Sequence, residues 1–227
     1  MRGALERKAL TQPLVERAVI RQFSRLYYYA AELDERRTWR NTHWFGTPVL
    51  KCPLDLWVYQ ELIASGRPDL IVETGTNRGG SALYLAALCD IAGHGEVVTI
   101  DIEPVPERVE HPRLSYLTAS STDPATVAAL RERASGKEGV MVMLDSDHTA
   151  AHVRRELDLY SDLVTVGSYL IVEDSNVNGH PVAPEFGPGP MEAVTDFLAR
   201  DGRFRADPDA ERFLLSMNPG GFLLRVR

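Results

Sequence analysis

The chain has 227 residues, of which 44% are hydrophobic, and a formal net charge of −7. This size and composition suit one α/β domain with an N-terminal extension. The negative charge disfavours a nucleic-acid partner, and apolar runs such as 140–144 are too short to span a membrane. Cys52 and Cys89 lack zinc-type spacing, and the basic opening stretch has no long apolar run, so we expect free thiols and a cytoplasmic protein.

The chain divides into two parts by its sequence pattern. Residues 1–66 are expected to form an N-terminal helical extension and cap. Within them, apolar residues at nearly helical spacing predict a helix over 13–29, and the charged, tryptophan-containing stretch 34–53 predicts an ordered covering loop. Residues 67–227 are expected to form one globular domain.

After Pro68, short β-rich runs alternate with helical ones, which is typical of a parallel sheet wrapped by helices. The short turn 218–221 between two apolar runs predicts a C-terminal antiparallel hairpin. Together these runs predict a doubly wound, mostly parallel, seven-stranded α/β sheet. An antiparallel last strand is typical of methyltransferases that use S-adenosylmethionine (SAM), rather than of NAD-binding domains. The expected strands are 70–74, 97–102, 114–119, 140–145, 169–173, 212–217 and 222–226, and the expected helices are 80–89, 124–134, 150–161 and 191–200.

The first strand leads into a glycine-rich turn with the pattern E-x-G-x-x-x-G at residues 73–79. Its glycines allow backbone amides to approach a ligand, and the following helix N-terminus favours a carboxylate. A glutamate at the end of the strand suits an ammonium group, and the methionine part of SAM carries both groups. Asp101, after the second strand, is placed to accept hydrogen bonds from ribose hydroxyls. The expected SAM-binding residues are Glu73, Gly75, Thr76, Asn77, Gly79, Ser81 and Asp101.

Acidic residues follow the fourth and fifth strands. Asp145 ends the fourth, and Glu173 and Asp174 end the fifth, so all three should face one crevice at the sheet edge. Oxygen ligands without thiolates select a hard ion, which predicts a Mg²⁺ site formed by these three carboxylates. A hydroxyl bound there becomes more acidic, and His148, three residues beyond Asp145, could take its proton. We therefore predict Asp145 and His148 as catalytic residues.

Simpler interpretations stay open for each of these features. The glycine-rich turn could merely close a βα loop, and Asp101 could cap its strand. Single acids at strand ends are often solvated or cap helices, and His148 could be a surface or capping residue. The proline-rich stretch 175–190 could be a lid over the metal or an ordinary connection.

These motifs resemble those of the cephalosporin hydroxylase-like and rhamnosyl O-methyltransferases, in stretches that span about residues 44–225. The matching stretches include 44–46, 51–61, 67–82 and 187–193. A more distant similarity is to catechol-type O-methyltransferases, in which lysine replaces His148 and Asp-Asn replaces Glu173-Asp174. The resemblance implies that Ser121 and Thr122 lie near the adenine and that the chain forms homo-oligomers.

The favoured hypothesis is Mg²⁺-dependent methyl transfer from SAM to a sugar hydroxyl, of deoxysugar or rhamnosyl type, on a natural product or glycolipid. The partner would thus be a glycosylated small molecule. Three alternatives remain: a phenolic or cephalosporin-type hydroxyl as the acceptor, a non-catalytic SAM-binding partner subunit and, least favoured, a NAD-dependent dehydrogenase.

Overall fold

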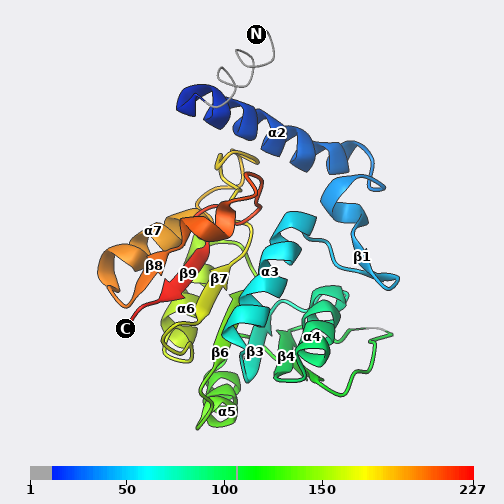
Figure 1. Ribbon diagram of the computed structural model, residues 1–227, viewed down its shortest axis with the longest axis vertical. Coiled ribbons are helices and arrows are strands. Elements are labelled where there is room, and N and C mark those ends of the chain that lie inside the picture. The colour runs from blue at the N-terminus through cyan, green and yellow to red at the C-terminus, as the bar shows by residue number, and fades with distance from the viewer. Residues whose placement is uncertain (1–11, 106) are drawn as a thin grey trace.

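A seven-stranded sheet in the order β5-β4-β3-β6-β7-β9-β8 forms the centre of the protein (Figure 1). The computed structural model describes residues 12–105 and 107–227, so the first eleven residues of the basic opening stretch lie outside it. Strand β9 runs antiparallel to β7 and β8, and the other neighbouring strands are parallel. The predicted fold class is confirmed. The strands are β3 (Leu70–Thr74), β4 (Glu96–Asp101), β5 (Leu114–Thr118), β6 (Val140–Leu144), β7 (Tyr169–Val172), β8 (Phe204–Ala206) and β9 (Phe222–Arg225).

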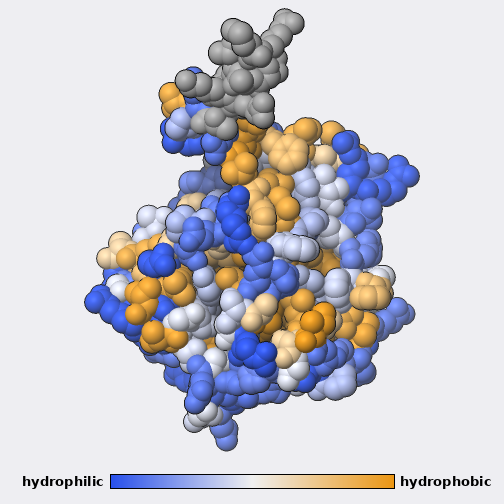
Figure 2. All heavy atoms as spheres, in the orientation of Figure 1, coloured by the Kyte–Doolittle hydropathy of each residue, from blue (hydrophilic) through white to orange (hydrophobic). Residues whose placement is uncertain are grey.

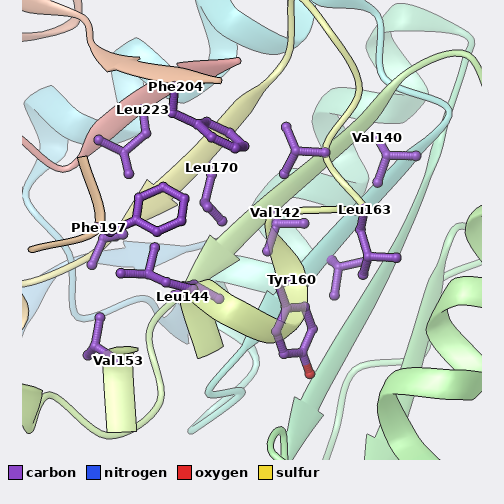
Figure 3. Close-up of a cluster of buried hydrophobic side chains, with 14 of the residues drawn as sticks. Val140, Val142, Leu144, Val153, Tyr160, Leu163, Leu170, Phe197, Phe204 and Leu223 are labelled. Atoms are coloured by element: carbon purple, nitrogen blue, oxygen red, sulfur yellow. The ribbon is translucent and has the colours of Figure 1, made fainter. Parts of the chain in front are cut away.

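Helices cover both faces of the sheet, which is why β3 and β6 are apolar and buried along their whole length. Helices α3 (Pro53–Gly66) and α4 (Gly80–Ala92) pack on one face. The other face carries α5 (Pro124–Ala134), α6 (Ala150–Tyr160) and α7 (Pro190–Arg200). Figure 3 shows part of this second core, in which Tyr160 and Phe197 face strand residues such as Val142 and Leu170.

The sequence misplaced one strand of the antiparallel edge. Residues 212–217 were expected to be a strand, but the partner of β9 is β8, and η2 (Pro208–Glu211) lies in the connection that follows β8. A backbone angle and a hydrogen bond explain the difference. Leu214 has a left-handed φ of 70°, and the backbone N–H of Met217 donates to the Asp55 carboxylate at 2.9 Å rather than to a strand. The apolar run packs against Cys52 instead of joining the sheet.

The N-terminal helix α2 (Pro13–Leu33) lies beside the α/β body at one end of the molecule (Figure 1). Its C-terminal part is anchored, since Tyr28 stacks on Trp39 and its carbonyl accepts a hydrogen bond from the indole N–H at 3.3 Å. The opposite side exposes apolar side chains that include Val19, Phe23 and Leu26. Figure 2 shows hydrophobic side chains gathered on the upper part of the molecule, where α2 lies. Between α2 and α3 lie η1 (Thr38–Asn41) and the antiparallel pair β1 (His43–Trp44) and β2 (Thr47–Pro48).

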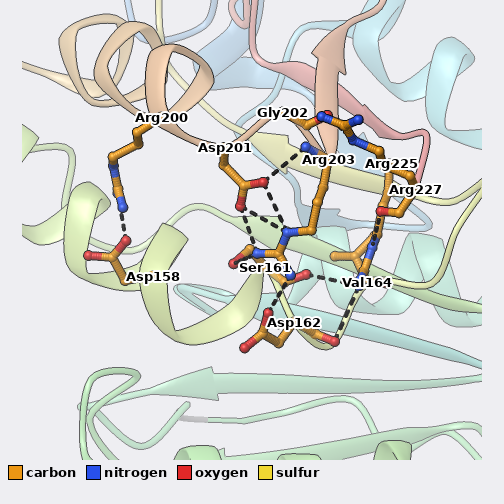
Figure 4. Close-up of polar contacts among 10 residues, drawn as sticks. All are labelled: Asp158, Ser161, Asp162, Val164, Arg200, Asp201, Gly202, Arg203, Arg225 and Arg227. Atoms are coloured by element: carbon orange, nitrogen blue, oxygen red, sulfur yellow. Dashed lines mark hydrogen bonds and ion pairs between the residues drawn. The ribbon is translucent and has the colours of Figure 1, made fainter.

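Arginine side chains fasten the antiparallel edge of the sheet to its neighbours (Figure 4). Arg203 forms ion pairs with Asp201 and Asp162, each at 2.6 Å, and Arg225 on β9 donates to the carbonyl of Val164. Exposed ion pairs each contribute about 0–1 kcal/mol to the free energy of unfolding. These contacts therefore orient the edge strands more than they stabilise the protein. In the part of the chain that the structure describes, none of the helices combines the length and apolar character needed to cross a bilayer.

Candidate active site

A crevice is expected where β3 and β6 lie side by side, because the chain leaves these two strands toward opposite edges of the sheet. Thr74 and Leu144 are paired at the carboxyl ends, so Gly75 and Asp145 follow at the same level. Gly75 has a φ of +85°, and a Cβ there would overlap the carbonyl of Asp145. Only glycine therefore allows the turn to lie this close to the acidic loop.

Replacing Gly75 by alanine is expected to lower the free energy of unfolding by more than ~2 kcal/mol, because a left-handed residue with a Cβ is strained and the Asp145 loop must also move. Chemical denaturation measures this loss. Gly167 is a matched control, since its φ is also +85° but a Cβ there meets nothing within 4 Å. Equal losses in the two alanine variants would show that the close approach to Asp145 contributes nothing.

Glu73 is completely buried beneath the glycine-rich turn. Its carboxylate accepts hydrogen bonds from the hydroxyls of Ser81 and Thr99, the latter at 2.7 Å, and the Thr76 hydroxyl lies 2.8 Å from that of Thr99. Burial raises the pKa of Glu73 to about 7, although nearby Lys51 and the two hydroxyls oppose this rise. In the structure Glu73 thus ties the turn to α4 and β4, and its contact with a ligand stays a prediction.

Asp101 lies at the end of β4, beside a cavity of about 390 Å³. Its carboxylate accepts hydrogen bonds from the backbone N–H groups of Asn77 at 2.9 Å and Glu103 at 3.1 Å. Thr76 and Tyr116 also line this cavity, and its volume is within the range of small-molecule sites. Gly79 caps the N-terminus of α4 with a φ of 77°. The turn, Asp101 and the cavity therefore adjoin one another, as a nucleotide-binding site requires.

Helix α6 fixes the loop that contains Ser121 and Thr122. The Tyr160 hydroxyl donates to the carbonyl of Ser121 at 2.7 Å, and Arg155 donates to that of Thr122 at 3.3 Å. The Ser121 hydroxyl lies 3.3 Å from Nε2 of His152. Their predicted contact with the adenine is a separate matter and stays a prediction.

Three side chains from two strand ends meet at the crevice. Nε2 of His148 lies 3.3 Å from Oδ2 of Asp174 and 3.9 Å from Oδ1 of Asp145. One donor atom from each residue falls within 4.8 Å of the others, and all three side chains are partly accessible. The structure thus brings the predicted base next to two of the three predicted metal-binding acids.

The third predicted acid, Glu173, faces a different set of partners. Its Oε1 pairs with the Lys51 ammonium at 2.9 Å and accepts a hydrogen bond from the Tyr59 hydroxyl at 2.7 Å. Asn218 in turn donates to the Tyr59 hydroxyl at 2.7 Å. Lys51 also lies 2.5 Å from Oδ2 of Asp145, so it joins Glu173 to the group that contains His148.

Sequence reasoning did not anticipate Lys51 and Asn218 as site residues, nor the contact of Tyr59 with Glu173. Each comes from a segment far from the acids along the chain, and a single lysine, tyrosine or asparagine carries no spacing signal. Asn218 was treated only as part of a turn, yet its side chain accepts the backbone N–H of Asp174 at 2.9 Å. It therefore orients both a predicted ligand and the tyrosine that contacts Glu173.

The acids and bases of the site shift each other's pKa values. Burial raises the pKa values of Asp145, Glu173 and Asp174, and the positive charges of Lys51 and His148 only partly offset this. Burial alone would lower the pKa of His148, but Asp174 and Asp145 raise it above its ordinary value. Burial alone would also lower the pKa of Lys51, but the negative charges of Asp145 and Glu173 raise it well above its ordinary value. The crevice thus concentrates negative charge that favours cations.

The donor set fits a hard divalent cation. Among the described residues, the converging group offers carboxylate oxygens of Asp145 and Asp174 and an imidazole nitrogen of His148. Carboxylates with open positions for water or substrate oxygens suit Mg²⁺. Cys52 and Cys89, both free and buried, are not members of this group.

The loop that leads from β7 to α7 is fastened to α2 and to α7. The backbone N–H of Ala183 donates to the Tyr29 hydroxyl on α2 at 2.9 Å. Glu192 on α7 accepts hydrogen bonds from Asn178 at 3.0 Å and from the backbone of Gly189 at 2.7 Å. These contacts connect α2 to the loop beside Asp174, and the lid role of the loop stays a prediction.

The sheet order, the antiparallel β9 and the glycine-rich turn beside a nucleotide-sized cavity define a class I methyltransferase fold. Two solved structures share it: CmcI with Mg and SAM has a TM-score of 0.64 at 24% identity over 82% of this chain and 77% of that one. The CmcI-N160 apo-structure has a TM-score of 0.65 at 23% identity, over 82% and 76%.

Sequence comparison then assigns the family. The Rhamnosyl O-methyltransferase/CmcI family matches residues 36–226, so the chain belongs to that family and is an O-methyltransferase by class. A rhamnosyl O-methyltransferase of Mycobacterium tuberculosis is 38% identical over 222 residues, which are 92% of this chain and 85% of that protein. The one from Mycobacterium leprae is 36% identical over 193 residues, or 82% and 84%. The family resemblance found in the sequence is confirmed.

Proposed function

We propose that this protein transfers the methyl group of SAM to a sugar hydroxyl of deoxysugar or rhamnosyl type, on a glycosylated small molecule, with Mg²⁺ in the crevice. The observation that carries the proposal is the convergence of Asp145, Asp174 and His148 beside the glycine-rich turn. This arrangement occurs in a chain that matches rhamnosyl O-methyltransferases over 92% of its length.

Each group of residues in the crevice has a separate proposed role. The turn amides and Asp101 would hold the carboxylate and ribose of SAM, while Asp145 and Asp174, with Glu173 beside them, would hold Mg²⁺. When bound, SAM supplies an electrophilic methyl group, and Mg²⁺ lowers the pKa of a coordinated hydroxyl. His148 Nε2 points into the same space and would accept the hydroxyl proton.

Geometry supports this choice of base. His148 follows β6, and its Nε2 lies 3.9 Å from Asp145 and 3.3 Å from Asp174, so a hydroxyl bound at these acids would lie within reach of it. Binding of a sugar with vicinal hydroxyls at this site would orient the reacting oxygen and lower the entropic part of the barrier.

The first test is calorimetric. We expect the EDTA-treated protein to bind SAM but not NAD, and to bind Mg²⁺. Binding of NAD, or a failure to bind SAM, would overturn the proposal. An Asp101→Ala variant should lose SAM affinity by about tenfold, since two hydrogen bonds to ribose are removed.

The acceptor requires a second experiment. We expect methyl transfer from labelled SAM to rhamnosyl glycosides in the presence of Mg²⁺, detected as a mass gain of the product. Transfer only to phenolic or cephalosporin-type hydroxyls would contradict the sugar acceptor and favour those hydroxyls as the acceptor instead. SAM binding without transfer to any acceptor would favour a non-catalytic partner subunit.

We also propose that the chain works as a cytoplasmic homo-oligomer. The exposed apolar side chains of α2, among them Val19, Phe23 and Leu26, support a contact between subunits, because such groups are stabilised when they leave water. Light scattering across a range of concentrations measures the subunit number.

A further inference from the structure

The two oxygens of Asp145 face two different basic side chains. Oδ2 lies 2.5 Å from the Lys51 ammonium, whereas Oδ1 faces His148 at 3.9 Å, within the group that fits a divalent cation. Glu173 is bound to the same ammonium at 2.9 Å. Asp145 is thus the carboxylate common to the lysine and to the proposed metal position.

Lys51 is brought into the crevice by a constrained piece of backbone. Leu50, the residue before it, has a left-handed φ of 59°, a conformation that costs a non-glycine residue free energy. The backbone N–H of Lys51 donates to the Thr42 hydroxyl at 3.2 Å, and α3 begins at Pro53, only two residues later. Only 5% of the Lys51 side chain is exposed, so its ammonium is enclosed by the protein.

The charge inventory shows why a lysine is needed there. Asp145, Glu173 and Asp174 are three acids at the ends of two adjacent strands, and Glu73 is buried below the neighbouring turn. Among the described residues, Lys51 is the ammonium in contact with these acids, and His148 adds a positive charge only when it is protonated. Uncompensated carboxylates in such a place are costly, because buried charge requires a partner.

We propose that Lys51 is a positioning residue that serves as a built-in counter-cation of the metal site. Its ammonium balances Asp145 and Glu173 when the metal is absent, and when the metal is present it shares Asp145 with it and weakens its binding. The inference rests on the proposed Mg²⁺ site. It assigns Lys51 no contact with the methyl donor or the acceptor.

The sign of the effect on metal affinity separates this role from ligand organisation. Removing a positive charge next to the metal position leaves the acids free to attract the metal, so Mg²⁺ should bind more tightly. If Lys51 instead held the ligands in a productive arrangement, its loss would weaken binding. Methionine is the suitable replacement because it keeps the length and apolar stem of lysine without the charge.

Calorimetric titration of Mg²⁺ at pH 8 into the full-length wild type and Lys51→Met tests this directly. We expect Lys51→Met to bind Mg²⁺ about tenfold more tightly. Lys137→Met is the control, because Lys137 pairs with Glu96 on the surface and its loss should leave the affinity unchanged. Equal or weaker binding by Lys51→Met would overturn the inference.

Melting in EDTA gives a second readout that does not depend on metal or activity. We expect the Tm of Lys51→Met to fall by roughly 10 °C, since one partner of a buried ion pair is missing. Lys51→Met/Glu173→Gln should regain most of this loss because it removes the unbalanced charge, and Mg²⁺ should raise the Tm of Lys51→Met more than that of the wild type.

If Lys51→Met fails to fold in EDTA, recovery in the double variant still supports the inference, and a double variant as unstable as the single one overturns it. A wild type that binds no Mg²⁺ would refute the proposed metal site. The EDTA melting series would then still decide whether Lys51 balances the carboxylates, so the two failures are distinguishable.

Discussion

Replacement of Asp145 by asparagine is expected to abolish measurable Mg²⁺ binding and to lower the rate of methyl transfer by about 10²–10³-fold. The amide removes a negative charge from the centre of the crevice, and a metal that lowers the pKa of the acceptor hydroxyl would contribute several kcal/mol, or roughly one decade of rate for each 1.4 kcal/mol. Calorimetry with Mg²⁺ and the methyl-transfer rate at saturating SAM measure the two effects.

Asp147→Asn is the matched control for this variant. Asp147 lies in the same loop, but its carboxylate accepts the backbone N–H of Thr149 at 2.7 Å at the start of α6, a role that asparagine also fills. Its Mg²⁺ affinity should equal that of the wild type. Unchanged Mg²⁺ affinity in Asp145→Asn would remove the metal site from the proposed mechanism.

Replacement of His148 by alanine is expected to lower kcat by about 10²–10⁴-fold, the usual contribution of a positioned general base. SAM affinity should be unchanged and Mg²⁺ affinity nearly so, because in the proposed mechanism the carboxylates hold the metal. Single-turnover kinetics measure the methyl-transfer step, and calorimetric titrations measure the binding of SAM and Mg²⁺, so the two effects can be separated.

A loss of Mg²⁺ binding in His148→Ala parallel to the loss of activity would contradict this role and make His148 a metal ligand. His94→Ala is the control, since His94 pairs with Asp69 at 2.8 Å in a partly exposed ion pair away from the crevice. Its activity and its metal affinity should both match those of the wild type.

The central strands could be predicted from the sequence because their environment leaves a simple pattern. Strands β3 and β6 are buried on both faces and are therefore continuous apolar runs bounded by turns, so the expected limits at 70 and 140 match the structure. The position of Asp145 at a strand end follows from the same regularity.

Two other elements left no such signal. Helix α3 was not anticipated, because Trp57 is exposed while Tyr59 is buried, which obscures its apolar face. The run Phe213, Leu214 and Leu215 is as apolar as a strand, yet its backbone turns at Leu214 and its side chains pack elsewhere. Local composition cannot reveal such tertiary preferences.

The candidate site was predictable in its acids and histidine but not in its cationic and hydroxyl partners. Asp145 and His148 lie in one loop, three residues apart, and this spacing indicates that both belong to one site. Lys51 reaches them from a segment 94 residues away, and its single positive charge resembles that of any surface lysine. Only the folded backbone shows that it is enclosed by carboxylates.

That separation along the chain has a consequence for how the protein folds. The crevice joins partners 94 residues apart in Lys51 and Asp145 and 159 apart in Tyr59 and Asn218. Contacts of such long range form late and slow folding. The site should therefore exist only in the native state. Its ligands should slow unfolding, and cation binding during refolding should report the last step of folding.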